Sequence, residues 1–399
     1  MSVAHPAWSV LLALAAGAAL LFVRRRVPPA GEALGAALVL VPCGAALAGL
    51  VPLGWTAAPL VAALVVAALA QEDADPLPGE CALKLLWVLG GALAVSAAGV
   101  ALLTFATGVA SAPEQWAVLQ LGLSPRLVSD IALPLALLAG VVLLGGAPFH
   151  FWVADVFQGV PAGLAPLAVA ALQAAGGAWL VSRLAGIEAF NGGADLAGVV
   201  LRTAAAAALL AGAGTILWQR RPERRVGTLA SLQGGLALAV LAVTVGRGRP
   251  VEQAAAWLVP WGAHLALALA GAAPLARLSA MDSSPGGPGA PLFRRHPLSA
   301  LAGLYALASL AGVPGTPGAA LWLDGARGLI ANGRSGLMLA LALAWLAAFA
   351  TVMRELREGF GARTEGEPVP NHVPAAARVA LWLSGAGLAA LGLARIVLG

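Results

Sequence analysis

The residues with the clearest chemical potential lie in the stretch Gly146–Pro161, which reads GAPFHFWVADVFQGVP. It contains His150 and Asp155, and it separates two apolar segments. An imidazole and a carboxylate beside a helix interrupted by Gly and Pro can form a proton-handling or hydrogen-bonding pair, since imidazole titrates near neutral pH. In the alternative, which we weigh more heavily, His150 anchors the loop and Asp155 caps the start of the next helix.

Few other ionisable residues fall inside apolar segments. His264 is central in its segment, where it can either titrate or make a satisfied interhelical hydrogen bond, and both alternatives stay open. Asp324 precedes Arg327 by three residues, a spacing that favours a local ion pair on one helical face. Arg202 and Asp130 lie near predicted helix ends. The sequence therefore offers few groups that can hold a proton inside an apolar segment.

The composition predicts that these residues belong to an integral membrane protein. Of 399 residues, 60% are hydrophobic and only 10% are charged, whereas a soluble domain carries about 25% charged residues. So few charges cannot cover a water-facing surface of this size, so we expect an all-α, polytopic helix bundle with the lipid bilayer as its outer solvent. The net charge of +5 comes mainly from arginines in short loops, and no nucleic-acid partner is expected.

Apolar runs long enough to cross a bilayer, about 20 residues each, recur along the chain. They cover roughly 7–23, 33–53, 55–71, 82–108, 128–148, 160–185, 198–218, 226–246, 252–277, 297–330, 335–353 and 375–397. The run at 297–330 is too long for one regular helix. Counted as a single broken helix, it gives about twelve crossings, with a range of 11 to 13.

The basic loops predict how these helices are oriented. Four arginine clusters fall on the same side of the predicted bundle: 24–26, 220–225, 277 with 294–295, and 354–363. The positive-inside rule makes that side cytoplasmic, which leaves both termini facing out. Arg126, Arg247, Arg249 and Arg334 run against this orientation. Tryptophans near predicted helix ends, among them Trp152 and Trp218, indicate interfacial anchoring.

Two apolar segments are interrupted by similar sequences. Residues 159–163 read GVPAG, and residues 312–316 read GVPGT. Interrupted helices at matching positions of two halves are typical of transporters built from repeats, although chance recurrence in so Gly-rich and Pro-rich a chain is an equal alternative. We expect two broken helices in an inverted-repeat core, unwound near mid-membrane around Pro161–Pro166 and Gly312–Gly318. The residues that break them are Gly159, Pro161, Gly312, Pro314 and Gly318.

The stretch at 146–161 resembles the Pro-Phe-His-x-Trp-x-x-Asp-Val-x-x-Gly-x-Pro signature of the antiporter-like membrane subunits of respiratory NADH–quinone oxidoreductase, most closely subunit N. Arg224-Arg225 followed by Ala230-Ser231 resembles the basic pair that opens a later helix in this family. The run from Ser309 to Pro314, then Gly318, resembles the stretch before its second broken helix. The resemblance covers 128–355, expected to be the antiporter-like core. It is weak over the helices of 1–110, and 375–397 is a last helix.

The sequence departs from this family where the family carries its proton relay. The resemblance implies a lysine in each broken helix and a glutamate in an earlier helix, but Lys84 is the only lysine. The two lysine positions fall on Gln173 and near Trp322, and no carboxylate occurs between Glu80 and Glu114. Gln173 can order water but cannot store charge. The proton-path candidates are therefore His150, Asp155, Gln173, His264 and Asp324.

The resemblance implies a multi-pass subunit of the cell inner (plasma) membrane, in contact with other membrane-arm subunits of an oxidoreductase complex. Its role would be to contribute to proton translocation or to scaffold it. The alternatives are a subunit of a multisubunit cation/proton antiporter or membrane-bound hydrogenase, and an unrelated secondary transporter. The sequence has no CxxC cluster, no haem-ligand His pair and no dinucleotide fingerprint, so we expect no cofactor and no redox centre in this chain.

Overall fold

The computed structural model describes residues 40, 53–69, 77–122, 126–160, 163–190, 192–245, 250–282, 293, 296–360, 373 and 375–398. The predicted span 7–23, nearly all of 33–53 and the arginines 24–26 lie outside these residues, as does Pro161.

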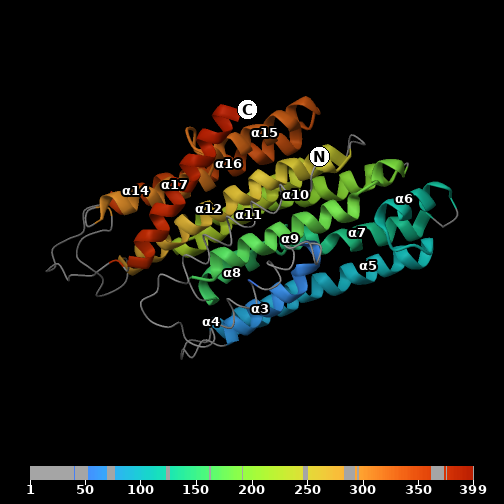
Figure 1. The fold of residues 1–399 in the computed structure, drawn as a ribbon, viewed down its shortest axis with the longest axis horizontal. Coiled ribbons are helices and arrows are strands. Elements are labelled where there is room, and N and C mark those ends of the chain that lie inside the picture. Colours follow the sequence, from blue (N-terminus) through green and yellow to red (C-terminus); the bar gives the residue numbers. More distant parts are fainter. Residues whose placement is uncertain are drawn as a thin grey trace.

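All regular structure in the described residues is helical, and the helices run along one elongated bundle (Figure 1). The elements are η1 (Leu53–Thr56), α3 (Ala57–Leu69), α4 (Leu77–Leu85), the π-helical η2 (Leu86–Gly90), α5 (Gly91–Thr107), α6 (Ala112–Gln120), α7 (Arg126–Leu143), α8 (Phe151–Gly159), α9 (Ala165–Leu184), η3 (Ile187–Ala189), α10 (Gly193–Trp218), α11 (Pro222–Val245), α12 (Glu252–Asp282), α14 (Pro297–Leu310), α15 (Pro317–Ala331), α16 (Ser335–Phe360) and α17 (Ala375–Leu398).

Eight helices within the described residues are long and apolar enough to cross a membrane. They begin at Leu77, Arg126, Ala165, Gly193, Pro222, Glu252, Ser335 and Ala377. The chain is therefore a multi-pass helical membrane protein, as its composition predicts. The total of twelve crossings stays a prediction, because two of the expected spans lie almost wholly outside the described residues.

Helix α11 forms the centre of the bundle, and the edges are formed by α3–α5 on one side and α14–α17 on the other (Figure 1). Nearly every residue of α11 from Arg225 to Val245 is buried, whereas α5 and α17 are exposed along much of their length. Small residues let α11 approach its neighbours. A Cβ at Gly227 would lie 2.6 Å from the Cα of Ala154, so α8 packs directly on the α11 backbone.

Two helical paths are interrupted. Helix α7 ends at Leu143 and α8 begins at Phe151, while α14 ends at Leu310 and α15 begins at Pro317. In Figure 1 the two helices of each pair extend toward opposite ends of the bundle. Each interruption contains glycine with positive φ, Gly145 at 83° and Gly312 at 71°, a conformation that residues with a Cβ rarely adopt. We call residues 144–150 the first interruption and residues 311–316 the second interruption.

The predicted unwinding around Pro161–Pro166 stays a prediction, because residues 161 and 162 lie outside the described residues. The segment 165–184 forms one continuous helix, α9, and Pro166 lies in its first turn, where a proline needs no backbone N–H partner. Gly159 is the last residue of α8 and allows close packing, since a Cβ there would collide with Cys81 of α4. Gly312 and Pro314 do lie in a turn between two helices, and Gly318 lies in the first turn of α15.

Helix boundaries also differ from the predicted ones at the charged residues. Arg224 and Arg225 lie on the first turns of α11, and Arg354 and Arg357 lie on the last turns of α16. A hydropathy window ends a span where charges begin, although the helix itself continues as long as its backbone hydrogen bonds do. The direction in which each of these arginine side chains leaves the backbone is therefore set by its helix.

Candidate functional site

His150 fastens the start of α8 to two neighbouring helices. Its Nε2 lies 3.3 Å from Oγ1 of Thr215 on α10, and its backbone carbonyl accepts a 3.1 Å hydrogen bond from the Ser231 hydroxyl on α11. It occupies the N-cap position of α8, but its side chain does not cap the helix. A proton-handling role for His150 stays a prediction.

Asp155 lies in the middle of α8, so the predicted alternative that it caps a helix start is wrong. Its side chain is nearly buried between two cations. Arg224 Nη1 donates to Asp155 Oδ1 at 2.7 Å and to the side-chain oxygen of Gln158 at 2.6 Å. Lys84 Nζ lies 3.5 Å from Asp155 Oδ2. A carboxylate taken out of water requires such paired charges, and Asp155 finds them in Lys84 and Arg224.

Lys84 links the edge of the bundle to this carboxylate. It lies on α4, where it also pairs with Glu80 at 2.6 Å, one helical turn away. Glu80, Lys84, Asp155 and Arg224 thus form a row of alternating charges from α4 through α8 to α11. The row holds three helices in register at one end of the bundle.

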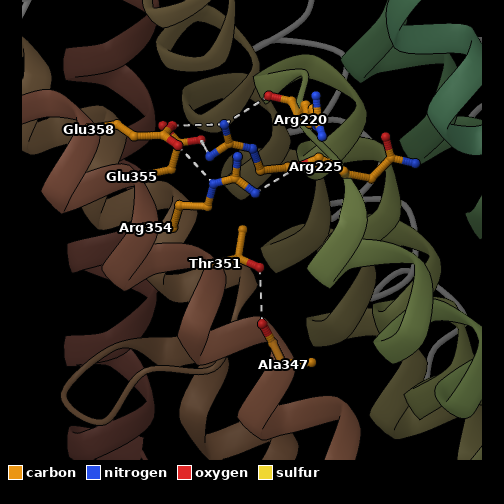
Figure 2. Close-up of polar contacts among 8 residues, drawn as sticks. Arg220, Arg225, Ala347, Thr351, Arg354, Glu355 and Glu358 are labelled. Carbon is orange, nitrogen blue, oxygen red and sulfur yellow. Dashed lines mark hydrogen bonds and ion pairs between the residues drawn. The ribbon is translucent and has the colours of Figure 1, made fainter.

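Arg225, the next residue on α11, forms a second network with residues of α16 (Figure 2). It is buried, and its guanidinium donates to Glu355 Oε1, to Glu358 Oε2 at 2.8 Å and to the carbonyl of Arg220 at 3.1 Å. Arg354 donates to Glu358 Oε1 at 2.7 Å and completes the cluster. The planar fork of one arginine bridges two carboxylates, and this ties α11 to α16.

The contacts place three of the four predicted arginine clusters at one end of the bundle. Arg354 Nη1 donates to the carbonyl of Gln219 at the end of α10, and Arg277 of α12 lies 3.5 Å from Glu223 of α11. The prediction that these clusters share a side is confirmed for Arg220–Arg225, Arg277 and Arg354. Arg24–Arg26 and Arg294–Arg295 lie outside the described residues.

Gln173, at a predicted lysine position, lies fully buried beside the first interruption. Its amide Nε2 donates to the carbonyl of Leu144 at 3.1 Å and to the carbonyl of Ala230 on α11 at 3.0 Å. Leu144 directly follows the last residue of α7, where carbonyls lose their intrahelical partners. A neutral amide thus satisfies a backbone group that would otherwise be unpaired inside the bundle.

Indole N–H groups do the same for other carbonyls at the interruptions. Trp152 is fully buried and donates to the carbonyl of Val142 at 2.8 Å, so its predicted role as an interfacial anchor is wrong. At the second interruption Trp345 donates to the carbonyl of Gly312 at 2.9 Å. Trp322, near the other predicted lysine position, is fully buried and stacks on Trp345 with ring centroids 5.6 Å apart. Both lysine positions therefore hold side chains that cannot titrate at neutral pH.

His264 lies fully buried at the second interruption. Its Nε2 lies 2.9 Å from the Ser309 hydroxyl, which also accepts a 3.2 Å hydrogen bond from the backbone N–H of Gly318. His264, Ser309 and Gly318 thus form a chain from α12 through α14 to α15. Asp324 lies farther along α15 and pairs with Arg327 at 3.7 Å, as their spacing predicts.

Buried charge is scarce in the part of the chain that the structure describes. The buried acidic and basic side chains there are Asp155, Arg225, His264 and Glu355, and all but His264 belong to the two ion-pair networks. The same part contains no group of three or more His, Cys, Asp or Glu that could hold a metal ion. The interior can therefore exchange hydrogen bonds, but it offers few groups that store charge.

Two buried residues that contact this site, Gln233 and Glu355, are not among the residues predicted from the sequence. Gln233 is fully buried on α11 and donates to the carbonyl of Leu310 at 2.6 Å. Glu355 pairs with Arg225 across 130 positions of the chain. An amide inside an otherwise apolar segment was a visible signal for Gln233, whereas Glu355 was hidden because its segment appeared to end before it.

Comparisons with known proteins show likeness at the level of fold. No family model and no curated protein sequence matches the chain. A chain of respiratory complex I from Thermus thermophilus with bound aureothin matches with a TM-score of 0.70 and 23% identity, over 98% of this chain and 84% of that chain. A chain of the membrane-bound sulfane sulfur reductase, an archaeal respiratory membrane complex, matches with a TM-score of 0.80 and 18% identity, over 99% of this chain and 80% of that chain.

A third match is a chain of the Mrp complex from Dietzia sp. DQ12-45-1b, with a TM-score of 0.74 and 18% identity, over 98% of this chain and 80% of that chain. At these identities a structural match is evidence of shared architecture and not of shared activity. The chain therefore has the fold of chains found in several respiratory and Mrp membrane complexes.

Proposed function

We propose that this chain is an antiporter-like, N-type membrane-arm subunit of a proton-translocating NADH–quinone oxidoreductase. One observation carries the proposal. Arg224 belongs to one segment that resembles the family and Asp155 to another, and their side chains form a 2.7 Å ion pair. Sequence signatures that are far apart in the chain thus meet in one network, which a chance match of short motifs does not predict. The shared fold over nearly the whole chain supports the same conclusion.

The proposed role of the subunit is to scaffold or support translocation rather than to run a lysine relay. A proton that crosses about 30 Å of hydrocarbon needs groups that can hold it part-way. The resemblance puts the family's lysine positions at Gln173 and near Trp322. Gln173 donates to backbone carbonyls instead, and Trp322 stacks on Trp345. Among the candidate proton-path residues that lie buried outside the ion-pair networks, Gln173 cannot titrate and His264 can. We therefore assign any residual path to His264.

We also propose that α7–α8 and α14–α15 are the paired broken helices of an inverted repeat. Both pairs are interrupted by a left-handed glycine, and both interruptions have carbonyls satisfied by side chains from neighbouring helices. In this arrangement the core predicted for 128–355 contains both interruptions, and 375–397 corresponds to the added helix α17.

A second candidate is a subunit of a cation/proton antiporter or of another respiratory membrane complex. The TM-scores of 0.80 and 0.74 with chains of the sulfane sulfur reductase and Mrp complexes favour it as much as the complex I match favours the first. An unrelated secondary transporter has less support, because the fold matches extend over nearly all of this chain.

Affinity purification of the tagged full chain from its native membrane, followed by identification of the co-purifying proteins, separates these candidates. Recovery of NADH-oxidising and quinone-reducing subunits supports the first proposal. Recovery of antiporter subunits without redox subunits supports the second. A chain that purifies alone and transports a solute after reconstitution contradicts both.

A further inference from the structure

The turn of α11 formed by residues 230–233 contacts both interruptions. This turn is fully buried, and its four residues span about 4.5 Å of helix axis, given 1.5 Å per residue. It lies between the first interruption on one side of the bundle and the second on the other. Its side chains and carbonyls are the groups that α11 offers to both.

On the first side the contacts fix both ends of the interruption. The Ala230 carbonyl accepts a hydrogen bond from Gln173 Nε2, which also donates to the Leu144 carbonyl. The Ser231 hydroxyl donates to the carbonyl of His150 at 3.1 Å. Gly234, one residue beyond the turn, lets the Leu144 carbonyl lie against the α11 backbone, where a Cβ would collide with it.

On the second side one amide fixes the end of α14. Gln233 Nε2 donates to the carbonyl of Leu310 at 2.6 Å, and Gln233 Oε1 accepts a 3.2 Å hydrogen bond from the indole of Trp261. Leu310 is the last residue of α14, so its carbonyl has no partner further along its own helix. Gln233 is held by α12 and in turn holds the start of the second interruption.

We infer that α11 couples the two interruptions. Loss of hydrogen bonds at one interruption then makes the hydrogen bonds at the other break more often. Residues 230–233 belong to one rigid helical turn, and a rotation or shift of this turn changes the contacts on both sides together. In an apolar interior each lost contact leaves a backbone carbonyl unsatisfied, which makes independent movement unfavourable. Gln233 and Gln173 are thus the positioning residues of this coupling.

Hydrogen exchange of the full chain in lipid nanodiscs tests the coupling. The reporting amides are those that are hydrogen-bonded at the interruptions, such as Gly145 and Gly146 at the first and Gly312 and Val313 at the second. In Gln233→Leu we expect exchange to rise about tenfold at the second interruption, as for the loss of one buried hydrogen bond. We expect a smaller but clear rise at the first interruption. Gln173→Leu should show the reverse order.

Gln115→Leu is the matched control, because Gln115 is equally buried and also donates from Nε2 to a carbonyl, that of Val109, but lies on α6. It should raise exchange near 104–116 and at neither interruption. A rise in exchange that is confined to the interruption next to each substituted residue overturns the coupling.

If a leucine variant raises exchange along the whole chain, Ser231→Ala is the deciding variant, because it removes one hydroxyl without leaving a large cavity. Unchanged exchange at the second interruption in Ser231→Ala then overturns the coupling as well. The outcome is independent of which complex the chain joins.

Discussion

Arg224 Nη1 lies 2.7 Å from Asp155 Oδ1, although 69 positions separate the two residues in the chain. Arg225, the next residue, points away from α11 in a different direction and pairs with Glu355 of α16. Neighbouring positions on a helix differ by about 100° in direction. Two adjacent arginines therefore tie α11 to α8 on one side and to α16 on the other, and both ties lie at the same end of the bundle.

The first prediction concerns the Asp155 pair. Arg224→Gln should lower the free energy of unfolding by about 3 kcal/mol, because it leaves the Asp155 carboxylate without its closest cation. The measurement is thermal or denaturant unfolding of the purified chain in detergent micelles. Adding Asp155→Asn should recover part of the loss, since the unpaired charge is then gone. Arg357→Gln changes an exposed arginine on α16 and should stay within about 0.5 kcal/mol of the parent. Equal stability of the Arg224 and Arg357 variants would contradict the pairing.

The second prediction is that Arg225 cannot be replaced by lysine. A lysine ammonium lacks the fork that reaches Glu355, Glu358 and the Arg220 carbonyl together. Arg225→Lys should therefore lower the free energy of unfolding by about 1.5–3 kcal/mol, the range for hydrogen bonds to charged groups. Arg277→Lys is the control, since Arg277 is exposed and has one 3.5 Å contact. If both lysine variants unfold at the same temperature, the Arg225 fork does not stabilise the chain and the prediction is wrong.

The third prediction concerns the packing of α8 on α11. Gly227→Ala places a Cβ against the Ala154 backbone, and we expect a loss of about 1–3 kcal/mol from overpacking. Gly214→Ala, on α10, meets nothing within 4 Å. It should be neutral or stabilising by up to about 1 kcal/mol, because alanine favours the helix. Melting temperatures of the two variants give the comparison, and a stabilised Gly227→Ala chain is the contrary result.

The fourth prediction concerns topology. Single cysteines introduced as Arg25→Cys and Arg221→Cys, in a chain with Cys43→Ala and Cys81→Ala, should react with a membrane-impermeant reagent from the same side of sealed vesicles. The positive-inside rule makes that side cytoplasmic. Ser335→Cys, at the opposite end of α16 from Arg354, should react from the other side. Reaction of the first two variants from opposite sides would rule out the twelve-crossing arrangement.

The sequence predicted the membrane class and most helices, because apolar run length reports directly on lipid exposure. It did not indicate the interruption between α7 and α8. The left-handed glycine there is Gly145, which a glycine-rich sequence hides among other glycines.

The sequence also could not predict which side chains of the site would pair with one another. Proximity in the chain left a His150–Asp155 pair as one alternative, but the two side chains contact different neighbours, Thr215 and Arg224. The arginine clusters were predicted as loops, so their ion pairs with α8 and α16 could not be foreseen. By contrast, Asp324 and Arg327 pair locally, where helix geometry alone decides the contact.

The last prediction is that the subunit does not move protons by a lysine relay. Gln173→Ala removes both hydrogen bonds to Leu144 and Ala230, so it should destabilise the chain by about 1–3 kcal/mol and reduce its assembly. It should leave the proton-to-electron ratio of the assembled complex in vesicles unchanged, because an amide stores no proton. His264→Ala should lower that ratio more than Gln173→Ala if any path through this subunit persists. Among the buried acidic and basic side chains of the described residues, His264 is the one outside the ion pairs. His264→Gln, which keeps a hydrogen-bonding group near Ser309, separates loss of a titratable group from loss of structure. A selective loss of pumping in Gln173→Ala, with electron transfer intact and His264→Ala harmless, would place the path at Gln173 and refute the prediction.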